Sequence, residues 1–221
     1  MFIGHFAVGF ASKRFAPRAP LVLLLAAPLL SDLLWPFFLQ FGWEHIRFVP
    51  GITRYNAFDL YDYPWSHSLL MGGVWATLFA AIYFAFSRYH AGAITIWIGV
   101  ISHWVLDWIT HIADMPLYPG GGPKLGLGLW NHVAATMIVE IVMFVVAFYL
   151  YWIATRTRDW IGTYACIAYA VVLLFLFVGA RFSAQPESVK QIVVPGLITE
   201  AILLAWPAWF DHHRVLRTTS T

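Results

Sequence analysis

The chain has 221 residues, of which 61% are hydrophobic, 18% are aromatic and only 11% are charged. The mean hydropathy of +0.72 excludes an ordinary soluble globular domain and predicts an integral membrane protein surrounded by a lipid bilayer. The formal net charge of +2 indicates no nucleic-acid partner, and the single cysteine, Cys166, excludes an internal disulfide and a thiolate metal cluster.

The N-terminal segment is apolar apart from His5 and the basic pair Lys13 and Arg14, but it is too short to cross a bilayer, which takes about 20 residues of helix. We therefore expect a re-entrant half-helix, with His5 deep in the membrane and the basic pair at an interface. No signal peptide is indicated, because the charges follow the apolar residues instead of preceding them. Pro17 and Pro20 end the half-helix.

Hydrophobic runs of sufficient length predict six transmembrane helices, at residues 21–41, 68–86, 91–113, 130–154, 161–180 and 191–210. Two long connections lie on one side: an aromatic loop of mixed charge at 42–65, followed by a predicted helix N-cap at Ser66, and a loop rich in proline and glycine at 115–123. The expected fold is all-α: a polytopic membrane helix bundle with about six transmembrane helices plus the N-terminal re-entrant half-helix. We expect a single membrane domain over residues 1–221.

Lysine and arginine residues are distributed unequally between the two sides of this predicted bundle. Eight of the 13 lie on the side that carries Lys13 and the C-terminal tail, and five lie on the side of the two long loops. Because cytoplasmic loops are enriched in basic residues, we expect the first side to be cytoplasmic and the long loops to face outward.

The segment 102–111, inside the third predicted span, carries two histidines and an aspartate with helical spacing. His103, Asp107 and His111 follow one another at intervals of four residues, so each lies about 40° around the helix from the last and about 6 Å further along it. Imidazoles and carboxylates on one stripe are ligands that zinc, manganese and iron accept. The alternative is a polar stripe that hydrogen-bonds to neighbouring helices, but ionisable residues inside a membrane span are costly and usually functional.

Further ionisable residues are expected at a similar depth. At about 1.5 Å per residue, Asp32, His103 and Glu140 would lie about 14–17 Å from the membrane surface on the side of the long loops. His5 would join them from the half-helix, and His67 would lie at the rim. We therefore expect the side chains of His5, Asp32, His103 and Asp107 to converge within one ion-coordination sphere or two adjacent ones in the outer half of the bundle. His67 and His111 are expected at the outer edge of this site.

Carboxylates near the membrane centre need compensation. On insertion scales each costs about 3 kcal/mol, so Asp32, Asp107, Glu140 and Glu200 together cost about 10 kcal/mol. A bound dication would offset this cost, whereas packing alone would not. Alternatively, Glu140 and Glu200 are carboxylates that orient a ligand imidazole. His132 is expected at the membrane interface or in contact with a metal ligand.

Two further expectations concern the loops and the aromatic residues. Asp114 is expected to be solvated on a loop. Several tryptophans on the outward side are expected to belong to the interfacial belt or to line a substrate groove: Trp35, Trp65, Trp104, Trp108 and Trp130.

Four short motifs occur in order along the chain: GHFAVGF at 4–10, SDLLWP at 31–36, SHSLL at 66–70 and SHWVLDWITH at 102–111. Together they resemble the bacterial family of membrane-bound, metal-dependent hydrolases of the inner membrane. The resemblance implies an inner-membrane protein with a hydrolase-like core at 1–155, followed by two additional spans and a basic tail at 156–221. It also implies that the polar positions of the family are occupied by His5, Asp32, His67, His103 and Asp107.

The motifs are also similar, more faintly, to the group of zinc-dependent phospholipases C and P1-type nucleases, which bind clustered zinc ions. That group has a second His-x3-Glu element, whereas the corresponding element here begins at His132 and ends on Thr136. This departure favours one or two metal ions over three.

These observations together predict an intramembrane metal-dependent hydrolase whose site opens toward the outer face. We expect one or two divalent ions, zinc before manganese or iron, which would activate water and polarise an ester or phosphoester of a lipid or other amphipathic substrate. The predicted metal ligands are His5, Asp32, His67, His103, Asp107 and His111. The predicted catalytic carboxylates are Asp107, Asp32 and Glu140.

Two other classes of function fit parts of this pattern. Intramembrane carboxylates and histidines also form pathways in transporters of metal ions or protons, although their confinement to the outer half argues against a continuous path. In a non-catalytic membrane scaffold, the same side chains would form hydrogen bonds between helices. The sequence leaves the substrate, the metal and the oligomeric state open.

Overall fold

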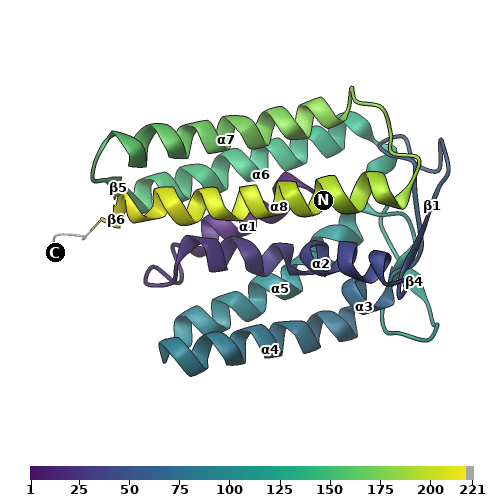
Figure 1. Cartoon of the computed structure of the whole chain (residues 1–221), viewed down its shortest axis with the longest axis horizontal. Helices are drawn as coiled ribbons and strands as arrows, with labels where there is room; N and C mark the ends of the chain where they lie inside the picture. The colour runs from purple at the N-terminus through teal and green to yellow at the C-terminus, as the bar shows by residue number, and fades with distance from the viewer. Residues whose placement is uncertain (218–221) are drawn as a thin grey trace.

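The computed structural model describes residues 1–217, which fold into a bundle of helices lying alongside one another (Figure 1). Six helices in this part of the chain are long and apolar enough to cross a membrane: α2 (Leu21–Gln40), α4 (Leu69–Ser87), α5 (His90–Thr110), α6 (Val133–Ala154), α7 (Trp160–Ala180) and α8 (Val189–His212). A shorter apolar helix, α1 (Ile3–Ser12), precedes them. The predicted all-α membrane bundle with an N-terminal half-helix is confirmed.

The two ends of the bundle carry different short elements. One end, the loop end, carries β1 (His45–Phe48), β2 (Phe58–Asp62), α3 (Pro64–His67), β3 (Met115–Pro116), β4 (Lys124–Leu125) and the 3-10 helix η1 (Leu129–Asn131). The opposite end, the tail end, carries β5 (Thr155–Thr157) and β6 (Arg214–Leu216). Figure 1 shows β1 and β4 at the right and β5 and β6 at the left, with α2 and α8 between the α4–α5 pair and the α6–α7 pair.

The loop between α2 and α3 contains a hairpin that the sequence analysis did not predict. β1 and β2 pair antiparallel, with His45 opposite Asp62 and Arg47 opposite Asp59. Arg47 and Asp59 form an ion pair, with Arg47 Nη2 2.6 Å from Asp59 Oδ2, and His45 Nδ1 lies within hydrogen-bond distance of Asp62 Oδ2 at 2.7 Å. Opposite charges at facing positions stabilise a hairpin. The pairing of the two strands also brings the segment before β1 close to the segment after β2.

The chain reaches α4 through the short helix α3, and the predicted N-cap at Ser66 is wrong. α3 begins at Pro64, whose missing N–H costs nothing at a helix start, and Ser66 lies inside this helix. The N-cap of α4 is Ser68, whose hydroxyl accepts a hydrogen bond from the Met71 N–H at 3.3 Å. The extended backbone of Ser68 separates the two helices.

α1 lies inside the bundle and is almost completely buried. Ile3, Phe6 and Phe10 are at most 2% exposed and belong to an apolar core that includes residues of α6, α7 and α8. Gly9 permits close contact with α2, because a Cβ at this position would lie only 2.8 Å from the Cα atom of Leu25. The re-entrant helix is therefore held among other helices, away from lipid.

The N-terminal turn of α1 ends inside the bundle, where its backbone N–H groups need acceptors. Glu140 of α6 supplies one, because its Oε2 accepts hydrogen bonds from the N–H of Phe2 at 2.8 Å and from the N–H of Gly4 at 3.2 Å. A carboxylate is also favoured at this position by the positive end of the helix dipole. Glu140 thus anchors α1 to α6.

The tail end is joined by β5 and β6, which pair antiparallel and connect the α6–α7 turn to the residues after α8. Arg214 donates hydrogen bonds to Thr155 Oγ1 at 2.9 Å and to the Gly162 carbonyl at 2.7 Å. His213 Nδ1 lies 2.7 Å from Asp159 Oδ2, and this hydrogen bond holds the pKa of Asp159 below its ordinary value. α7 and α8 are therefore tied together at this end.

Asp211 of α8 joins three further segments at the tail end. Its Oδ2 accepts hydrogen bonds from the Lys13 ammonium at 3.0 Å and from the Leu21 N–H at 3.1 Å, and its Oδ1 accepts one from the Tyr151 hydroxyl at 2.9 Å. The Lys13 and Asp211 side chains are only 8% and 15% exposed. Charge-assisted hydrogen bonds shielded in this way are among the stronger ones in proteins.

Replacing Asp211 with alanine should lower thermal stability, because three donors lose a shielded, charged acceptor at once. The expected loss is about 2–3 kcal/mol, since Lys13 keeps its hydrogen bond to the Ala19 carbonyl. Thermal unfolding in detergent, followed by circular dichroism, should show a midpoint lowered by about 5 °C or more. Asp62→Ala, which removes the exposed pair with His45, is the control and should change the midpoint by less than about 2 °C. Equal midpoints for the two variants would contradict this role of Asp211.

Candidate metal centre

Imidazole and carboxylate side chains from four helices come together in the loop-end half of the bundle. We call this group the polar cluster; it consists of His5 on α1, Asp32 on α2, His67 on α3, and His103, Asp107 and His111 along and at the end of α5. The four histidines and Asp107 are at most 5% exposed. The structure thus brings together all six residues that the sequence analysis predicted as metal ligands.

The Asp107 carboxylate lies between three histidines. Its Oδ1 is 3.1 Å from His5 Nε2, and its Oδ2 is 3.1 Å from His103 Nε2 and 3.5 Å from His111 Nε2. The Met1 amino group also donates a hydrogen bond to Oδ1. The rings of His5 and His103 stack with centroids 4.0 Å apart. The three α5 residues therefore share one face, and that face meets α1.

A second group forms around Asp32. Its Oδ1 lies 3.4 Å from His67 Nε2 and 3.9 Å from His103 Nε2, so His103 is shared between the two groups. In each group three ligand atoms lie within 4.8 Å of one another. His67, which was predicted at the rim, is 5% exposed and belongs to this second group; the helix α3 that carries it lies just before the span α4.

The Nδ1 atoms of three histidines lie against hydrogen-bond acceptors. The pairs are His103 with the Pro28 carbonyl at 2.8 Å, His111 with Asp114 Oδ1 at 3.0 Å, and His67 with Ser66 Oγ at 2.6 Å. Acceptors at these positions favour the tautomer with the proton on Nδ1, which leaves the lone pair of Nε2 free. All three Nε2 atoms face a carboxylate of the polar cluster. This is the arrangement in which histidines bind metal ions through Nε2.

Glu44 in turn holds the Ser66 hydroxyl. Its Oε1 accepts hydrogen bonds from the N–H groups of Trp65 and Ser66, both at 2.7 Å, and its Oε2 accepts one from Ser66 Oγ at 2.6 Å. With its proton directed to Glu44, Ser66 Oγ accepts from His67 Nδ1. Glu44 is 1% exposed, and burial raises the pKa of its carboxyl above the ordinary value. The role of Glu44 gives no signal in the sequence, because the β1–β2 hairpin separates it from Ser66 along the chain.

Asp114 is buried beside His111, and the prediction that it is solvated is wrong. It is 8% exposed and accepts a hydrogen bond from the Tyr63 hydroxyl at 3.1 Å in addition to the one from His111 Nδ1. Burial raises the pKa of the Tyr63 phenol well above its ordinary value, so this hydroxyl keeps its proton. The following loop covers the end of α5, since the Gly128 N–H donates to the His111 carbonyl at 2.7 Å.

Three other residues singled out in the sequence have different positions. The Glu140 Oε2 binds the start of α1, while its Oε1 has no hydrogen-bond partner within residues 1–217. Glu200 is half-buried in α8, and its Oε2 also lacks a partner within that range. His132 occupies the N-cap position of α6. The imidazoles of the polar cluster are thus oriented by Glu44 through Ser66, by Asp114 and by a backbone carbonyl.

A cavity of about 860 Å³ reaches the polar cluster. Its inner part is lined by Asp32, His67, Asp107, His111 and Glu140. Apolar and aromatic side chains make up most of the remaining wall, including Phe2, Tyr55 and Leu176. Two of the five tryptophans expected at a groove, Trp35 and Trp130, also line it.

The atoms that lack partners fit a bound cation. Within residues 1–217, buried His103 Nε2 makes no hydrogen bond although it lies 3.1 Å from Asp107 Oδ2, and buried His5 Nδ1 has no hydrogen-bond partner either. Buried polar atoms are normally paired, so unpaired atoms in a cluster of this composition favour a ligand that the protein itself does not supply. Imidazole nitrogens and carboxylate oxygens are ligand atoms for zinc, manganese and iron.

Comparisons with known proteins give no match: no protein-family model, no curated protein and no solved structure matches the chain. The resemblance based on the four sequence motifs therefore stays a prediction.

Replacing Glu44 with glutamine should weaken zinc binding by roughly tenfold or more, because the Ser66 hydroxyl loses the acceptor that orients it toward His67. Competition with a fluorescent zinc chelator measures this change. Ser66→Ala should have a similar effect, and the double variant should be little worse than either single one, since both act through the same imidazole. Glu187→Gln, on an exposed loop, is the control. Unchanged zinc affinity in folded Glu44→Gln would contradict this role.

Proposed function

We propose that this integral membrane protein is a metal-dependent hydrolase that cleaves an ester or phosphoester of a lipid or other amphipathic substrate. The observation that supports it most directly is the polar cluster of four imidazoles and two carboxylates, of which Asp32, His67, Asp107 and His111 line a largely apolar cavity. Three of the imidazoles are fixed through Nδ1 and direct Nε2 toward the carboxylates. Histidines that bind metal ions are commonly fixed in this way by an acceptor at the other ring nitrogen.

The two groups within the polar cluster would hold one or two divalent ions, with zinc favoured over manganese or iron. His5 and Asp107 would serve one position, Asp32 and His67 the other, and His103 lies between them. A dication bound there would lower the pKa of a water ligand and polarise the substrate ester. His111 lies beside Asp107 and is held by Asp114, so it supports the first position.

The two carboxylates of the polar cluster have different surroundings and hence different proposed roles. Asp32 is 34% exposed toward the cavity, so it is the carboxylate that reaches water and substrate and the candidate to accept a proton. Asp107 is only 3% exposed and is enclosed by His5, His103 and His111, so it holds these imidazoles in position. Glu140 borders the cavity but is engaged by the backbone of α1.

The proposed location is a bacterial inner membrane, with the loop end facing outward. The tail end carries eight of the 13 lysine and arginine residues, which favours the cytoplasmic side. Under this orientation the cavity and the polar cluster lie in the outer half of the membrane. The four motifs of the sequence favour the same location.

Purified wild-type protein, stripped of affinity tags and loosely bound ions, should contain at least one equivalent of zinc, manganese or iron by elemental analysis. His103→Ala and Asp107→Asn should each remove most of this metal, because His103 is shared between the two groups and Asp107 is the carboxylate of the first. Hydrolysis of ester substrates in mixed micelles should fall by about 100-fold or more in both variants. His132→Ala, at the start of α6, is the control and should retain the metal and the activity.

Three outcomes would contradict this proposal. Wild-type protein that contains no stoichiometric metal would show that the polar cluster is not a metal site. Variants with lower thermal stability but unchanged metal content would indicate a scaffold in which the polar cluster joins helices. Uptake of zinc or manganese by proteoliposomes containing the protein would indicate a transporter.

A further inference from the structure

We infer that the cavity binds an anionic glycerophospholipid, with the lipid phosphate at Arg181 and an acyl ester at the polar cluster. This inference rests on the proposed hydrolase function, and it adds the class of substrate and the bond that is cleaved. Three observations support it: the cavity runs from the polar cluster to the surface at the loop end, its wall is mostly apolar, and Arg181 lines it.

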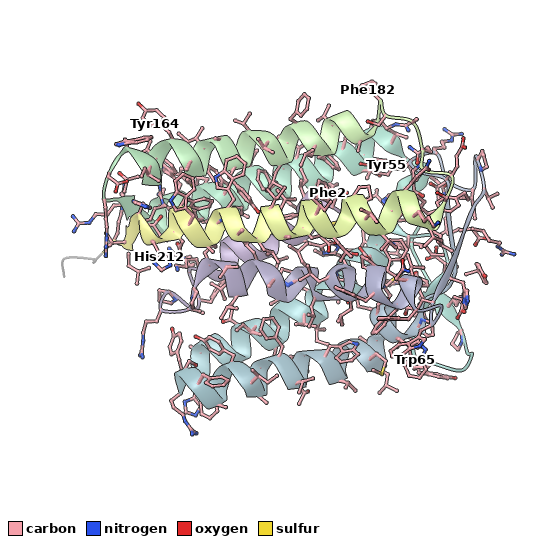
Figure 2. The ribbon with its side chains drawn as sticks, in the orientation of Figure 1. Phe2, Tyr55, Trp65, Tyr164, Phe182 and His212 are labelled. Carbon is pink, nitrogen blue, oxygen red and sulfur yellow. The ribbon has the colours of Figure 1, made fainter. Side chains whose placement is uncertain are left out.

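The cavity extends from the polar cluster to the surface of the bundle at the loop end. Phe175 and Phe182 line it and are 73% and 83% exposed, so it opens at the end of α7. Figure 2 shows Phe182 at this end of the bundle and Phe2, which also lines the cavity, further inside. Residues of α8, including Pro195, line it as well. The opening therefore lies where two transmembrane helices meet the membrane surface, within reach of a lipid in the bilayer.

The size and the wall of the cavity suit an acyl chain. Its volume of about 860 Å³ lies near the upper end of the range of about 300–1,000 Å³ that is usual for small-molecule sites. Most of its wall is apolar. Gly179 leaves further room, because a Cβ at this position would meet no atom within 4 Å. A chain in the cavity would be removed from water and held between α7 and the inner helices.

Arg181 is the one lysine or arginine among the residues that line the cavity in the described part of the chain. Its hydrogen bond within residues 1–217 goes to the Tyr55 carbonyl at 3.3 Å. A guanidinium carries five N–H donors and binds phosphate through two of them at once, so donors are left for a ligand. The charge at the opening therefore favours an anionic head group over a zwitterionic one.

Depth indicates which bond of such a lipid lies at the polar cluster. Arg181 directly follows the last residue of α7, whereas His103 lies seven residues before the end of α5 at Thr110, about 10 Å further inside the bundle. In a glycerophospholipid the acyl esters lie on the chain side of the phosphate. With the phosphate at Arg181, an acyl ester faces the polar cluster.

The corresponding reaction consumes one water molecule. The water oxygen forms a bond to the acyl carbon, and the bond between that carbon and the glycerol oxygen breaks. One proton of the water goes to the glycerol oxygen, and the fatty acid leaves as a carboxylate with release of the other proton. The products are a fatty acid and a lysophospholipid, without any oxidant or further reactant.

Binding of phosphatidylglycerol and phosphatidylcholine with identical chains tests the inference, measured by native mass spectrometry of the full-length protein in detergent. Wild type should bind phosphatidylglycerol roughly tenfold more tightly, and Arg181→Gln should abolish this preference. Gly179→Leu should weaken binding of both lipids by placing a side chain in the cavity. The controls are Arg158→Gln, exposed at the tail end, and Gly73→Leu, on α4 where a Cβ also meets no atom within 4 Å; both should bind like wild type.

Each other outcome counts for or against the inference. Equal affinity for the two lipids, or displacement of phosphatidylglycerol by inorganic phosphate alone, would overturn the assignment of Arg181. Release of fatty acid supports the assigned bond, whereas release of diacylglycerol would overturn it while leaving the proposed hydrolase function intact. A retained lipid preference without hydrolysis of any ester would support the lipid site and contradict the hydrolase function.

Discussion

A carboxylate in the apolar interior of a membrane bundle has to be surrounded by donors, and the position of Asp107 depends on this constraint. A charged residue near the membrane centre costs about 3 kcal/mol. The Met1 amino group and His5 Nε2, both within hydrogen-bond distance of Asp107 Oδ1, help to offset this cost. His5 can take part only because α1 stops inside the bundle, and α1 can stop there because Glu140 binds its N-terminal amides. The geometry of the polar cluster therefore depends on the packing of α1 against its neighbours.

The loops of this protein are part of the candidate site as well as connections between helices. Glu44 precedes the β1–β2 hairpin, Asp114 follows α5, and each fixes a different histidine through Nδ1, either directly or through Ser66. Both acidic residues are nearly inaccessible to water. The loops at the loop end thus fix the orientation of the His67 and His111 imidazoles, in addition to the packing of the helices.

Local features of the sequence were sufficient to predict the helices and the members of the polar cluster. Hydrophobic length identified the six spans, the shortness of the first apolar run indicated a half-helix, and the four-residue spacing of His103, Asp107 and His111 placed them on one face. Glu44, the burial of Asp114 and the strand pairs depend on contacts between distant segments, for which helical periodicity gives no signal. The contact between His67 and Asp32 likewise depends on the short helix α3, which precedes the membrane span.

The pairing of β5 with β6 has a mechanical consequence for α7 and α8. Hydrogen bonds of Arg214 and the contact between His213 and Asp159 fasten the two helices at the tail end. At the loop end they are connected by residues 181–188, beside the opening of the cavity. The spacing of the two helices is thus set by hydrogen bonds at the tail end, whereas beside the cavity it is set by this connection and by apolar packing such as that of Val193.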